Sequence, residues 1–339
     1  MQAKILLIYT GGTIGMVKDF ETGELRAFDF DQLLSRIPEL TQLDCEIQSL
    51  SFDSPIDSSN MNPDCWVKIA EIIETNYTQF DGFVVLHGSD TMSYSSSALS
   101  FMLENLSKPV IFTGSQLPIG DLRTDAKENL ITSIQIASLR KNGQAVIKEV
   151  CLYFEYKLYR ANRTTKINAE HFEAFTSLNY PTLAESGVHL RVHEEYLLHP
   201  NKKPLKVHKT LDPNIALIKL FPGITENTLN CILTNPKIKA IVLETYGAGN
   251  APTEKWFEKS LKNAIDSGKI IVNVTQCSGG SVIMGRYQTS SHLKKLGIIS
   301  GKDITTEAAL TKLMYLLGSD LDAKVFKTIY EASLRGEMS

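Results

Sequence analysis

The sequence predicts an α/β protein of two domains, in which a larger, mostly parallel N-terminal sheet flanked by helices precedes a smaller C-terminal α/β domain. Short apolar runs recur along the chain, and each is followed by a polar or glycine-containing turn and then by a segment with helical spacing. This alternation is typical of parallel β-α units. The length of 339 residues allows two domains of common size.

The predicted strands are mostly apolar throughout, as expected of parallel strands that helices cover on both faces. Ligands of open parallel sheets bind beyond the carboxyl ends of the strands, so the residues after each run are the first candidates for a site. The predicted strands are Lys4–Tyr9, Gly82–Leu86, Pro109–Thr113, Val150–Tyr156, Ala216–Leu220, Ala240–Glu244 and Ile270–Thr275.

Two helix starts are marked by capping residues. Asn62 followed by Pro63 places a capping side chain and a proline at the first positions of a helix. Asp125 and Glu128 have the spacing of a capping box ahead of an apolar stripe. We therefore expect a helix to begin at each of these places.

The stretch from Asn179 to Pro213 has a different composition, with four of the seven histidines, four prolines and many lysines. The β-α alternation restarts at Ile215. We therefore expect an N-terminal α/β domain over residues 1–190, a connecting segment over 191–213 and a C-terminal α/β domain over 214–339.

Composition and charge favour a small-molecule partner. The formal net charge of −3, without a long block of Lys or Arg, gives no general attraction to nucleic acid or to a membrane surface. The apolar run Ile5–Tyr9 is too short for a signal peptide or a membrane span, and we expect a cytoplasmic protein. The five cysteines are widely spaced without a C-x-x-C pair, which argues against disulfides and zinc and favours free thiols.

The first predicted strand ends in Thr10-Gly11-Gly12-Thr13-Ile14-Gly15. The paired glycines allow a sharp turn and close approach of a ligand to backbone N–H groups, and Thr10 and Thr13 present hydroxyls there. The spacing matches neither common phosphate-binding loop, which makes a nucleotide site a weak interpretation. A simple tight turn is the alternative.

Two further junctions are rich in hydroxyls and carboxylates. His87-Gly88-Ser89-Asp90-Thr91-Met92 directly follows a predicted strand, and such a hydroxyl next to a carboxylate can anchor a zwitterion or polarise a nucleophile. Alternatively, Asp90 only caps the next helix. Asp57-Ser58-Ser59-Asn60 reads either as a run of turns before a capped helix or as a carboxylate-binding segment, and both interpretations stay open.

A hydroxyl nucleophile needs a group that accepts its proton, and Lys166 is the candidate. A desolvated lysine can be neutral near pH 7, although most lysines are simply solvated. His189 and His193 would share a helix face and could bind a metal if their segment were helical, but Gly187 and the nearby prolines argue against a helix. We therefore expect no metal site.

These junctions together resemble the bacterial-type L-asparaginase family, and most closely its cytoplasmic type I branch. Six motifs carry the resemblance, and they occur in the family's order nearly from end to end of the chain. They are T-G-G-T-I-G-M at 10–16, D-S-S-N-M at 57–61, H-G-S-D-T-M at 87–92, T-G-S-Q-L-P at 113–118, R-A-N-R-T-T-K at 160–166 and Y-G-A-G-N-A-P at 246–252. The resemblance implies an asparaginase-like two-domain fold and hydrolysis of the side-chain amide of L-asparagine to L-aspartate and ammonia, without a cofactor or a metal.

The resemblance also implies catalytic roles. Thr13 is the expected nucleophile and forms a β-aspartyl enzyme, while Ser89, Asp90 and Lys166 form a second hydroxyl-carboxylate-amine group that relays a proton. Many relatives carry a lid tyrosine after the first motif, and this chain has none over residues 17–30. Tyr287 resembles a tyrosine that some type I relatives bring near the nucleophile.

Substrate contacts and assembly follow from the same resemblance. Asp57 and Ser58 are expected to hold the α-amino and α-carboxylate groups, with Ser89 and Asp90 sharing in substrate binding and Asp90 contacting the ammonium. Ser115 is expected beside the amide end of the substrate. Family sites are completed across a dimer interface, so we expect a homotetramer built as a dimer of dimers, or else a dimer, in which Asn250 reaches a neighbouring protomer.

Two departures from the family pattern carry expectations. Ser89 stands where threonine is usual, which keeps the hydroxyl but loses the methyl that restricts χ1. Glu244 stands where some type I relatives have an arginine that binds an allosteric asparagine, although Thr165 and Cys277 resemble other residues of that site. A carboxylate at Glu244 repels the effector's carboxylate, and we expect no activation by asparagine.

Three alternatives remain beside asparagine hydrolysis. A glutaminase-asparaginase of broader specificity is one, because a pocket rejects one extra methylene by only about 1–3 kcal/mol. The glutamine-dependent amidotransferase subunits resemble this family but carry an extra N-terminal domain, whereas the first motif here begins at residue 10. A non-catalytic amino-acid-binding protein on the same fold would be marked by loss of Thr13, Asp90 or Lys166, and all three are present.

Overall fold

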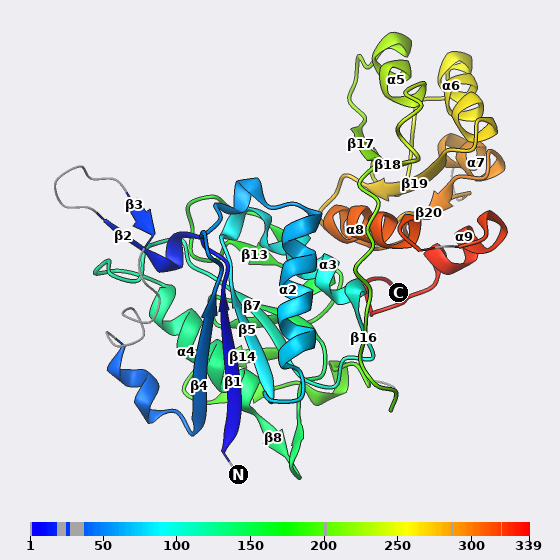
Figure 1. The fold of residues 1–339 in the computed structure, drawn as a ribbon. Coiled ribbons are helices and arrows are strands. Elements are labelled where there is room, and N and C mark those ends of the chain that lie inside the picture. Colours follow the sequence, from blue (N-terminus) through cyan, green and yellow to red (C-terminus); the bar gives the residue numbers. More distant parts are fainter. Residues whose placement is uncertain (1, 19–24, 28–36, 200–201, 286–287, 320) are drawn as a thin grey trace. The chain divides into compact units, whose positions relative to one another are not determined.

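The computed structural model describes residues 2–18, 25–27, 37–199, 202–285, 288–319 and 321–339. The chain divides into two units, residues 1–209 and 210–339, and each has a sheet with helices around it (Figure 1). The predicted α/β class is confirmed. No helix in the described ranges combines the length and the apolar character that crossing a membrane requires.

The sheet of the first unit has the strand order β15-β14-β11-β10-β7-β5-β1-β4. The strands from β4 to β10 in this order are parallel, whereas β11, β14 and β15 are antiparallel to their neighbours. The strands are β1 (Ala3–Tyr9), β4 (Cys45–Ser51), β5 (Gly82–Leu86), β7 (Val110–Thr113), β10 (Val150–Phe154), β11 (Lys157–Arg160), β14 (Ala184–Ser186) and β15 (Leu190–Val192).

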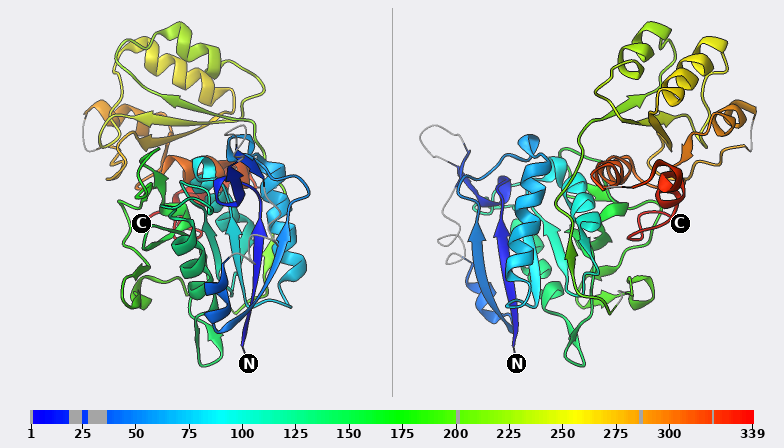
Figure 2. Two further views of the ribbon diagram at one scale, coloured as in Figure 1. Left: turned by 90° about the vertical axis from the view of Figure 1, so that its left-hand side faces the viewer. Right: turned by 45° about the vertical axis from the view of Figure 1, so that its right-hand side comes forward.

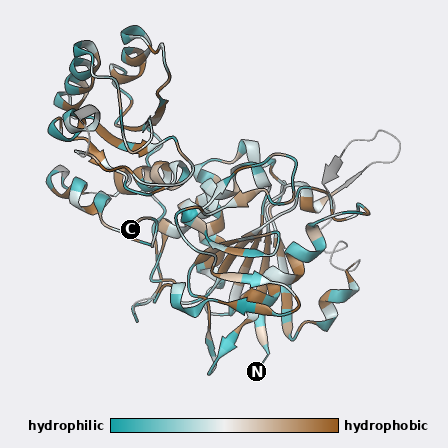
Figure 3. Ribbon diagram, turned by 180° about the vertical axis from the view of Figure 1, so that it is seen from behind, coloured by the Kyte–Doolittle hydropathy of each residue, from teal (hydrophilic) through white to brown (hydrophobic). Residues whose placement is uncertain are grey.

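The central parallel strands are the ones that the apolar runs predict, because helices cover both of their faces. Every residue of β5 is buried, and Figure 3 shows the strands in the middle of this sheet as the most hydrophobic part of the unit. Strand β10 ends at Phe154, two residues before the predicted end. Glu155 and Tyr156 have φ values of 45° and 67°, so they form the turn into β11.

The edge strand β4 was not predicted. Its residues from Cys45 to Ser51 alternate irregularly between buried, half-buried and exposed, which gives no continuous apolar run. It lies in register beside β1, with Cys45 opposite Ala3. A strand of this kind is fixed by its neighbour rather than by its own hydrophobicity.

Helices lie on both faces of the first sheet (Figures 1 and 2). Helix α4 (Ala126–Ser138) packs its Leu130 and Ile134 against Ile5 and Leu7 of β1 in one core cluster. The remaining long helices of this unit lie on the other face of the sheet. The side chains of β1 point alternately to the two faces, so β1 also packs toward this second layer. Its helices are α2 (Pro63–Asn76) and α3 (Met92–Met102).

Both helices begin where they are predicted to begin, but only one of the two predicted caps is present. Asn62 caps α2, and its side-chain oxygen accepts a hydrogen bond from the backbone N–H of Cys65 at 3.2 Å, as predicted. Asp125 precedes α4 but makes no capping hydrogen bond, so the predicted capping box is wrong. Its carboxylate instead accepts from the backbone N–H of Gln116 at 2.9 Å, because a distant loop supplies a better set of donors.

The segment after residue 179 continues the first unit. It contains β14, β15, η6 (Glu194–Tyr196) and β16 (Lys206–Val207), which pairs with β6 (Leu103–Glu104). His189 and His193 flank the strand β15, so they do not share the face of a helix. No group of His, Cys, Asp and Glu suited to a metal occurs among the described residues.

Short elements connect the main ones in the first unit. Several of them carry residues of the site described below. They are η1 (Thr13–Gly15), β2 (Met16–Lys18), β3 (Leu25–Ala27), η2 (Pro38–Gln42), η3 (Ser58–Asn60), η4 (Ser89–Thr91), β8 (Arg140–Lys141), β9 (Gln144–Ala145), η5 (Ala161–Arg163), β12 (Thr165–Lys166) and β13 (Phe175–Thr176).

The second unit has a parallel sheet with the order β17-β18-β19-β20. Its predicted strands are confirmed to within one residue at each end. The elements are β17 (Ile215–Lys219), α5 (Glu226–Leu233), β18 (Ala240–Thr245), α6 (Lys255–Asp266), β19 (Ile270–Thr275), α7 (Gln288–Lys295), β20 (Ile299–Ser300), α8 (Thr306–Leu317) and α9 (Ala323–Glu331).

Candidate active site

Close glycine contacts bring the loops after β1, β4 and β5 together at the carboxyl edge of the first sheet. A Cβ atom on Gly12 would lie 2.5 Å from the Cα of Gly88, and one on Gly88 would lie 2.5 Å from Oγ of Ser58. Only glycine permits backbones to approach this closely. Thr13 directly follows Gly12, and Ser89 directly follows Gly88. The two residues therefore begin where these loops touch.

The two threonines of the first loop have different surroundings. Thr10 is fully buried, and its Oγ1 donates a hydrogen bond to the carbonyl of Leu86 at 3.0 Å. Thr13 begins η1 and is partly exposed, and its hydroxyl makes no hydrogen bond to any residue that the structure describes. Thr10 therefore serves the fold, and the hydroxyl of Thr13 is the one that the described residues leave without a partner.

An amine, a carboxylate and a hydroxyl meet at this edge. The Nζ atom of Lys166 donates to Oδ1 of Asp90 at 2.6 Å and to Oγ of Ser89 at 2.9 Å. The pairing of β12 with β13 places Lys166, whose side chain is 17% exposed, while that of Asp90 is 67% exposed. The carboxylate thus lies open to solvent, and the amine is largely enclosed beside it.

The interpretation of Asp90 as a simple helix cap is wrong. The residue at the cap position of α3 is Thr91, and Asp90 lies one residue earlier, inside η4. The Oγ1 of Thr91 donates to the carbonyl of Ser58 at 2.7 Å, and this bond links the loop after β5 to the loop after β4. The side chain of Asp90 therefore reaches Lys166 instead of the backbone of its own helix.

Asp57 stabilises its own turn. Its Oδ1 accepts hydrogen bonds from the backbone N–H of Ser59 at 2.9 Å and from the Ser59 hydroxyl at 2.8 Å. These bonds lower the pKa of Asp57, so its carboxylate is ionised at neutral pH. The turn interpretation of this segment is confirmed. An ionised carboxylate on the same loop as the buried Ser58 also leaves a negative charge near the meeting point of the three loops.

Residues at the start of α4 hold the loop after β7 through hydrogen bonds. The carboxylate of Asp125 accepts from the backbone N–H groups of Gln116 at 2.9 Å and Leu117 at 3.2 Å, and Asn129 donates to the carbonyl of Gly114 at 3.0 Å. Burial raises the pKa of Asp125. Ser115 is buried at 1% exposure.

The hydroxyl of Ser115 is already engaged. It donates to the carbonyl of Leu117 at 2.6 Å, inside its own loop. The hydroxyl of Ser115 therefore shapes this loop.

Gln116 is a site residue that the sequence analysis missed. Its Oε1 accepts from Oγ of Ser89 at 3.0 Å, and its Nε2 donates to the carbonyls of Ala169 and His171, both at 3.1 Å. Its place in the motif T-G-S-Q-L-P at 113–118 is the signal that points to it, but the motif by itself assigns no role to the glutamine. The contact itself joins segments far apart in the chain.

Tyr287 and Asn250 are the two other residues predicted for the site. Tyr287 falls outside the described residues. Asn250 belongs to the second unit, where it forms a bridge with Tyr246 after β18. The part of both residues in the site therefore stays a prediction.

A fully buried histidine, His87, directly precedes the loop that carries Ser89 and Asp90. The ring of His87 bonds the carbonyl of Gly88 through Nδ1 at 2.7 Å, and its Nε2 has no partner among the described residues. Burial lowers its pKa to about 4, because charging the ring in this apolar place is costly.

We expect this histidine to make stability depend on pH. Its pKa is lowered in the folded state, so the unfolded chain binds more protons below the ordinary histidine pKa of about 6.5. The stabilisation is present near pH 7 and is lost as the pH falls, by about 3 kcal/mol between about pH 7 and about pH 4. Urea unfolding of the protein and of His87→Gln across this range measures the difference, and the variant should lose less stability.

Other groups titrate in the same range, so a matched control is needed. His199 is exposed, and His199→Gln should keep the pH dependence of the unsubstituted protein. Equal slopes for the protein and His87→Gln would show that His87 does not carry this dependence.

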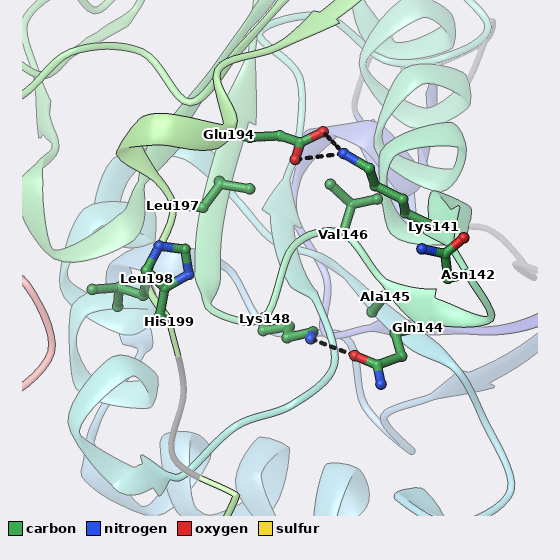
Figure 4. Close-up of a pocket in the computed structure, with 10 residues that line it drawn as sticks. All are labelled: Lys141, Asn142, Gln144, Ala145, Val146, Lys148, Glu194, Leu197, Leu198 and His199. Atoms are coloured by element: carbon green, nitrogen blue, oxygen red, sulfur yellow. Dashed lines mark hydrogen bonds and ion pairs between the residues drawn. The ribbon is translucent and has the colours of Figure 1, made fainter.

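A cavity of about 340 Å³ lies near the β8–β9 hairpin, which follows the end of α4 at the amino edge of the sheet (Figure 4). Its charged side chains already have partners, since Lys141 pairs with Glu194 at 2.8 Å and Lys148 bonds Gln144 at 3.1 Å. None of its lining residues carries a hydroxyl. This cavity therefore lacks the groups for acyl transfer that the carboxyl edge provides.

Comparisons with known proteins match the chain along most of its length. The family model "Asparaginase, N-terminal" matches residues 4–197, and "Glutaminase/Asparaginase C-terminal domain" matches residues 214–330. L-asparaginase 1 of Escherichia coli (strain K12) is 42% identical over 341 aligned residues, which cover 100% of this chain and 99% of that protein. The 60 kDa lysophospholipase of Mus musculus is 39% identical and is covered over 63% of its length.

A solved structure agrees with these sequence matches. The crystal structure of L-asparaginase I from Vibrio cholerae O1 biovar eltor str. N16961 has a TM-score of 0.91 and 40% identity, with 100% of both chains covered. The asparaginase-like two-domain fold that the motifs predict is thereby confirmed.

Proposed function

Since this chain belongs to the L-asparaginase family, we propose that Thr13 is the nucleophile with which it hydrolyses the side-chain amide of L-asparagine to L-aspartate and ammonia. The observation that carries the site assignment is the contact of Gly12 with Gly88, because it sets Thr13 next to the loop of Ser89. Lys166 reaches that loop from a separate strand.

The proposed reaction has two steps. Thr13 Oγ1 attacks the amide carbon, the C–N bond breaks, and the hydroxyl proton passes to the leaving nitrogen, so that ammonia departs and a β-aspartyl ester remains on Thr13. Water then cleaves the ester and returns the proton to Thr13. Ser89, Asp90 and Lys166 move protons in both steps, because they form a continuous hydrogen-bonded chain.

Charge complementarity suggests how the amino acid is held. The ionised carboxylate of Asp57 and the exposed carboxylate of Asp90 suit the α-ammonium group. Ser58 is expected to contact the α-carboxylate, and Ser115 to border the amide end through the loop it shapes. Ser89 belongs to both the substrate site and the proton relay.

One assay tests the activity. Ammonia release from asparagine and from glutamine is measured with the same preparation, and asparagine is expected to give the higher kcat/KM. The margin can be modest, since one methylene changes the binding free energy by about 1–3 kcal/mol. Comparable rates with both amides would favour a glutaminase-asparaginase, and binding of aspartate without turnover of either amide would favour the non-catalytic alternative.

We further propose a cytoplasmic homotetramer, or else a dimer. All five cysteines are free thiols, which suits a reducing compartment. Ile167 and Leu178 lie near Lys166 in the sequence and are 53% and 60% exposed, and a second copy that covers them would bury apolar surface close to the site. Asn250 of a neighbouring protomer and Tyr287 are then candidates to complete the site. Sedimentation of the assayed sample tests the assembly.

We also expect no activation by asparagine. Glu244 is 8% exposed, accepts from the hydroxyl of Thr306 at 2.5 Å and pairs with Lys219 at 3.6 Å, so a carboxylate occupies this place in β18. An effector carboxylate would be repelled there. Initial rates over a wide range of asparagine concentration should fit a hyperbola, with a Hill coefficient of about 1. A sigmoidal curve that Glu244→Ala abolishes would contradict this expectation.

A further inference from the structure

The side-chain amide of Gln116 is held in one orientation. Its Nε2 donates to two backbone carbonyls, those of Ala169 and His171, each at 3.1 Å. A carbonyl only accepts hydrogen bonds, so the nitrogen of the amide must face these two groups. The oxygen of the amide then faces Ser89 at 3.0 Å.

This orientation fixes the hydroxyl of Ser89. The amide oxygen of Gln116 only accepts, so Ser89 donates its proton to it and offers a lone pair to Lys166, which donates at 2.9 Å. The backbone of Gln116 is anchored in turn by the buried carboxylate of Asp125. Ser89 is thus clamped between Gln116 and Lys166, two residues whose own positions are fixed from other segments.

Serine needs such a clamp more than a β-branched residue does. Without a second heavy atom on Cβ, the χ1 angle of Ser89 is free to visit three staggered positions. Ser89 can exchange protons with the groups proposed above only in the χ1 position that keeps its oxygen within hydrogen-bond distance of Lys166. The hydrogen bond from Ser89 to Gln116 selects one of these positions.

We propose that Gln116 is the positioning residue for Ser89, supplying through a hydrogen bond the χ1 constraint that a β-methyl group would otherwise supply. The proposal rests on the catalytic role assigned to Ser89 under the proposed function. It assigns Gln116 no contact with the reacting atoms, and it predicts an effect on turnover rather than on substrate affinity.

A double-mutant cycle tests the proposal. Methionine has nearly the length of glutamine but cannot form these hydrogen bonds, so Gln116→Met should lower kcat about 10-fold and change KM less than about 3-fold. In the Ser89→Thr background the added methyl restricts χ1. There, Gln116→Met should lower kcat by less than about 3-fold.

Thr124→Val is the matched control. Its hydroxyl donates to the carbonyl of Leu117 at 3.1 Å, so this change loosens the same loop without touching Ser89. Its effect on kcat should be equal in the unsubstituted protein and in the Ser89→Thr background. A purely structural role of Gln116 would give the same pattern as this control.

Several results would overturn the proposal. One is an equal loss of kcat for Gln116→Met in both backgrounds, and another is no loss of kcat in either. A third is a Ser89→Thr protein that is too slow to assay, because the methyl group would then not replace the hydrogen bond. Gln116→Met that fails to fold in both backgrounds would also overturn it, because Gln116 would then serve the fold. Failure of the proposed function is distinguishable, because the unsubstituted protein itself would then release no ammonia from asparagine.

Discussion

Thr13→Ala is expected to lower the rate of ammonia release from asparagine by a factor on the order of 10⁴ or more, because no other group then forms the acyl intermediate. Thr13 is partly exposed, and its hydroxyl is not used by the described part of the fold, so the variant should unfold at the same temperature as the unsubstituted protein. Aspartate should still bind, since the residues proposed to hold its charged ends are unchanged. Ammonia release and aspartate titration calorimetry measure the two effects.

Thr10→Val is the matched control for this prediction. It removes the other hydroxyl of the same loop, which donates to Leu86 in the core, and should cost about 1 kcal/mol of stability while leaving turnover within a few-fold. The assignment of the nucleophile fails if Thr13→Ala keeps near-normal turnover, or if Thr10→Val is the variant that loses it.

Lys166→Met is expected to lower kcat by about 10²- to 10⁴-fold, the range for loss of a group that transfers protons. The methionine fills the space of the lysine stem, and the partner carboxylate of Asp90 is 67% exposed, so no buried charge is left unpaired. The fold should therefore survive. The pH profile of the remaining activity should also change shape, which loss of packing alone would not cause.

Lys157→Met controls for the loss of a positive charge. Lys157 lies in the same unit and pairs with Glu173 at 3.5 Å on the surface. Exposed pairs of this kind contribute little, so activity and stability should change only slightly. If Lys157→Met and Lys166→Met reduce kcat equally, general charge and not the relay explains the loss.

Local patterns were enough for the buried elements of the fold. Apolar runs locate β1, β5, β17, β18 and β19, because strands that helices cover are mostly apolar, whereas the two-residue strand β20 gives no such run. The cap at Asn62 is also local, since donor and acceptor lie three residues apart. The family motifs then predicted Thr13, Ser89, Asp90 and Lys166 as a group, and hydrogen bonds join the last three.

Where a residue has partners both near and far in the sequence, the local pattern misleads. Asp125 has the spacing of a capping box, yet its carboxylate holds the loop of Gln116. The strand β4 is half-exposed and gives no apolar run.

The composition and motifs of the chain thus sufficed for its class, its buried strands and its family, because these depend on hydrophobicity and on residue types at fixed spacing. Packing alone decided that Thr10 is structural, that Gly12 lies against Gly88, and that Gln116 bonds Ser89 across 27 residues of sequence. Such contacts join segments whose approach is set by the whole sheet, and no local pattern of residues encodes that approach.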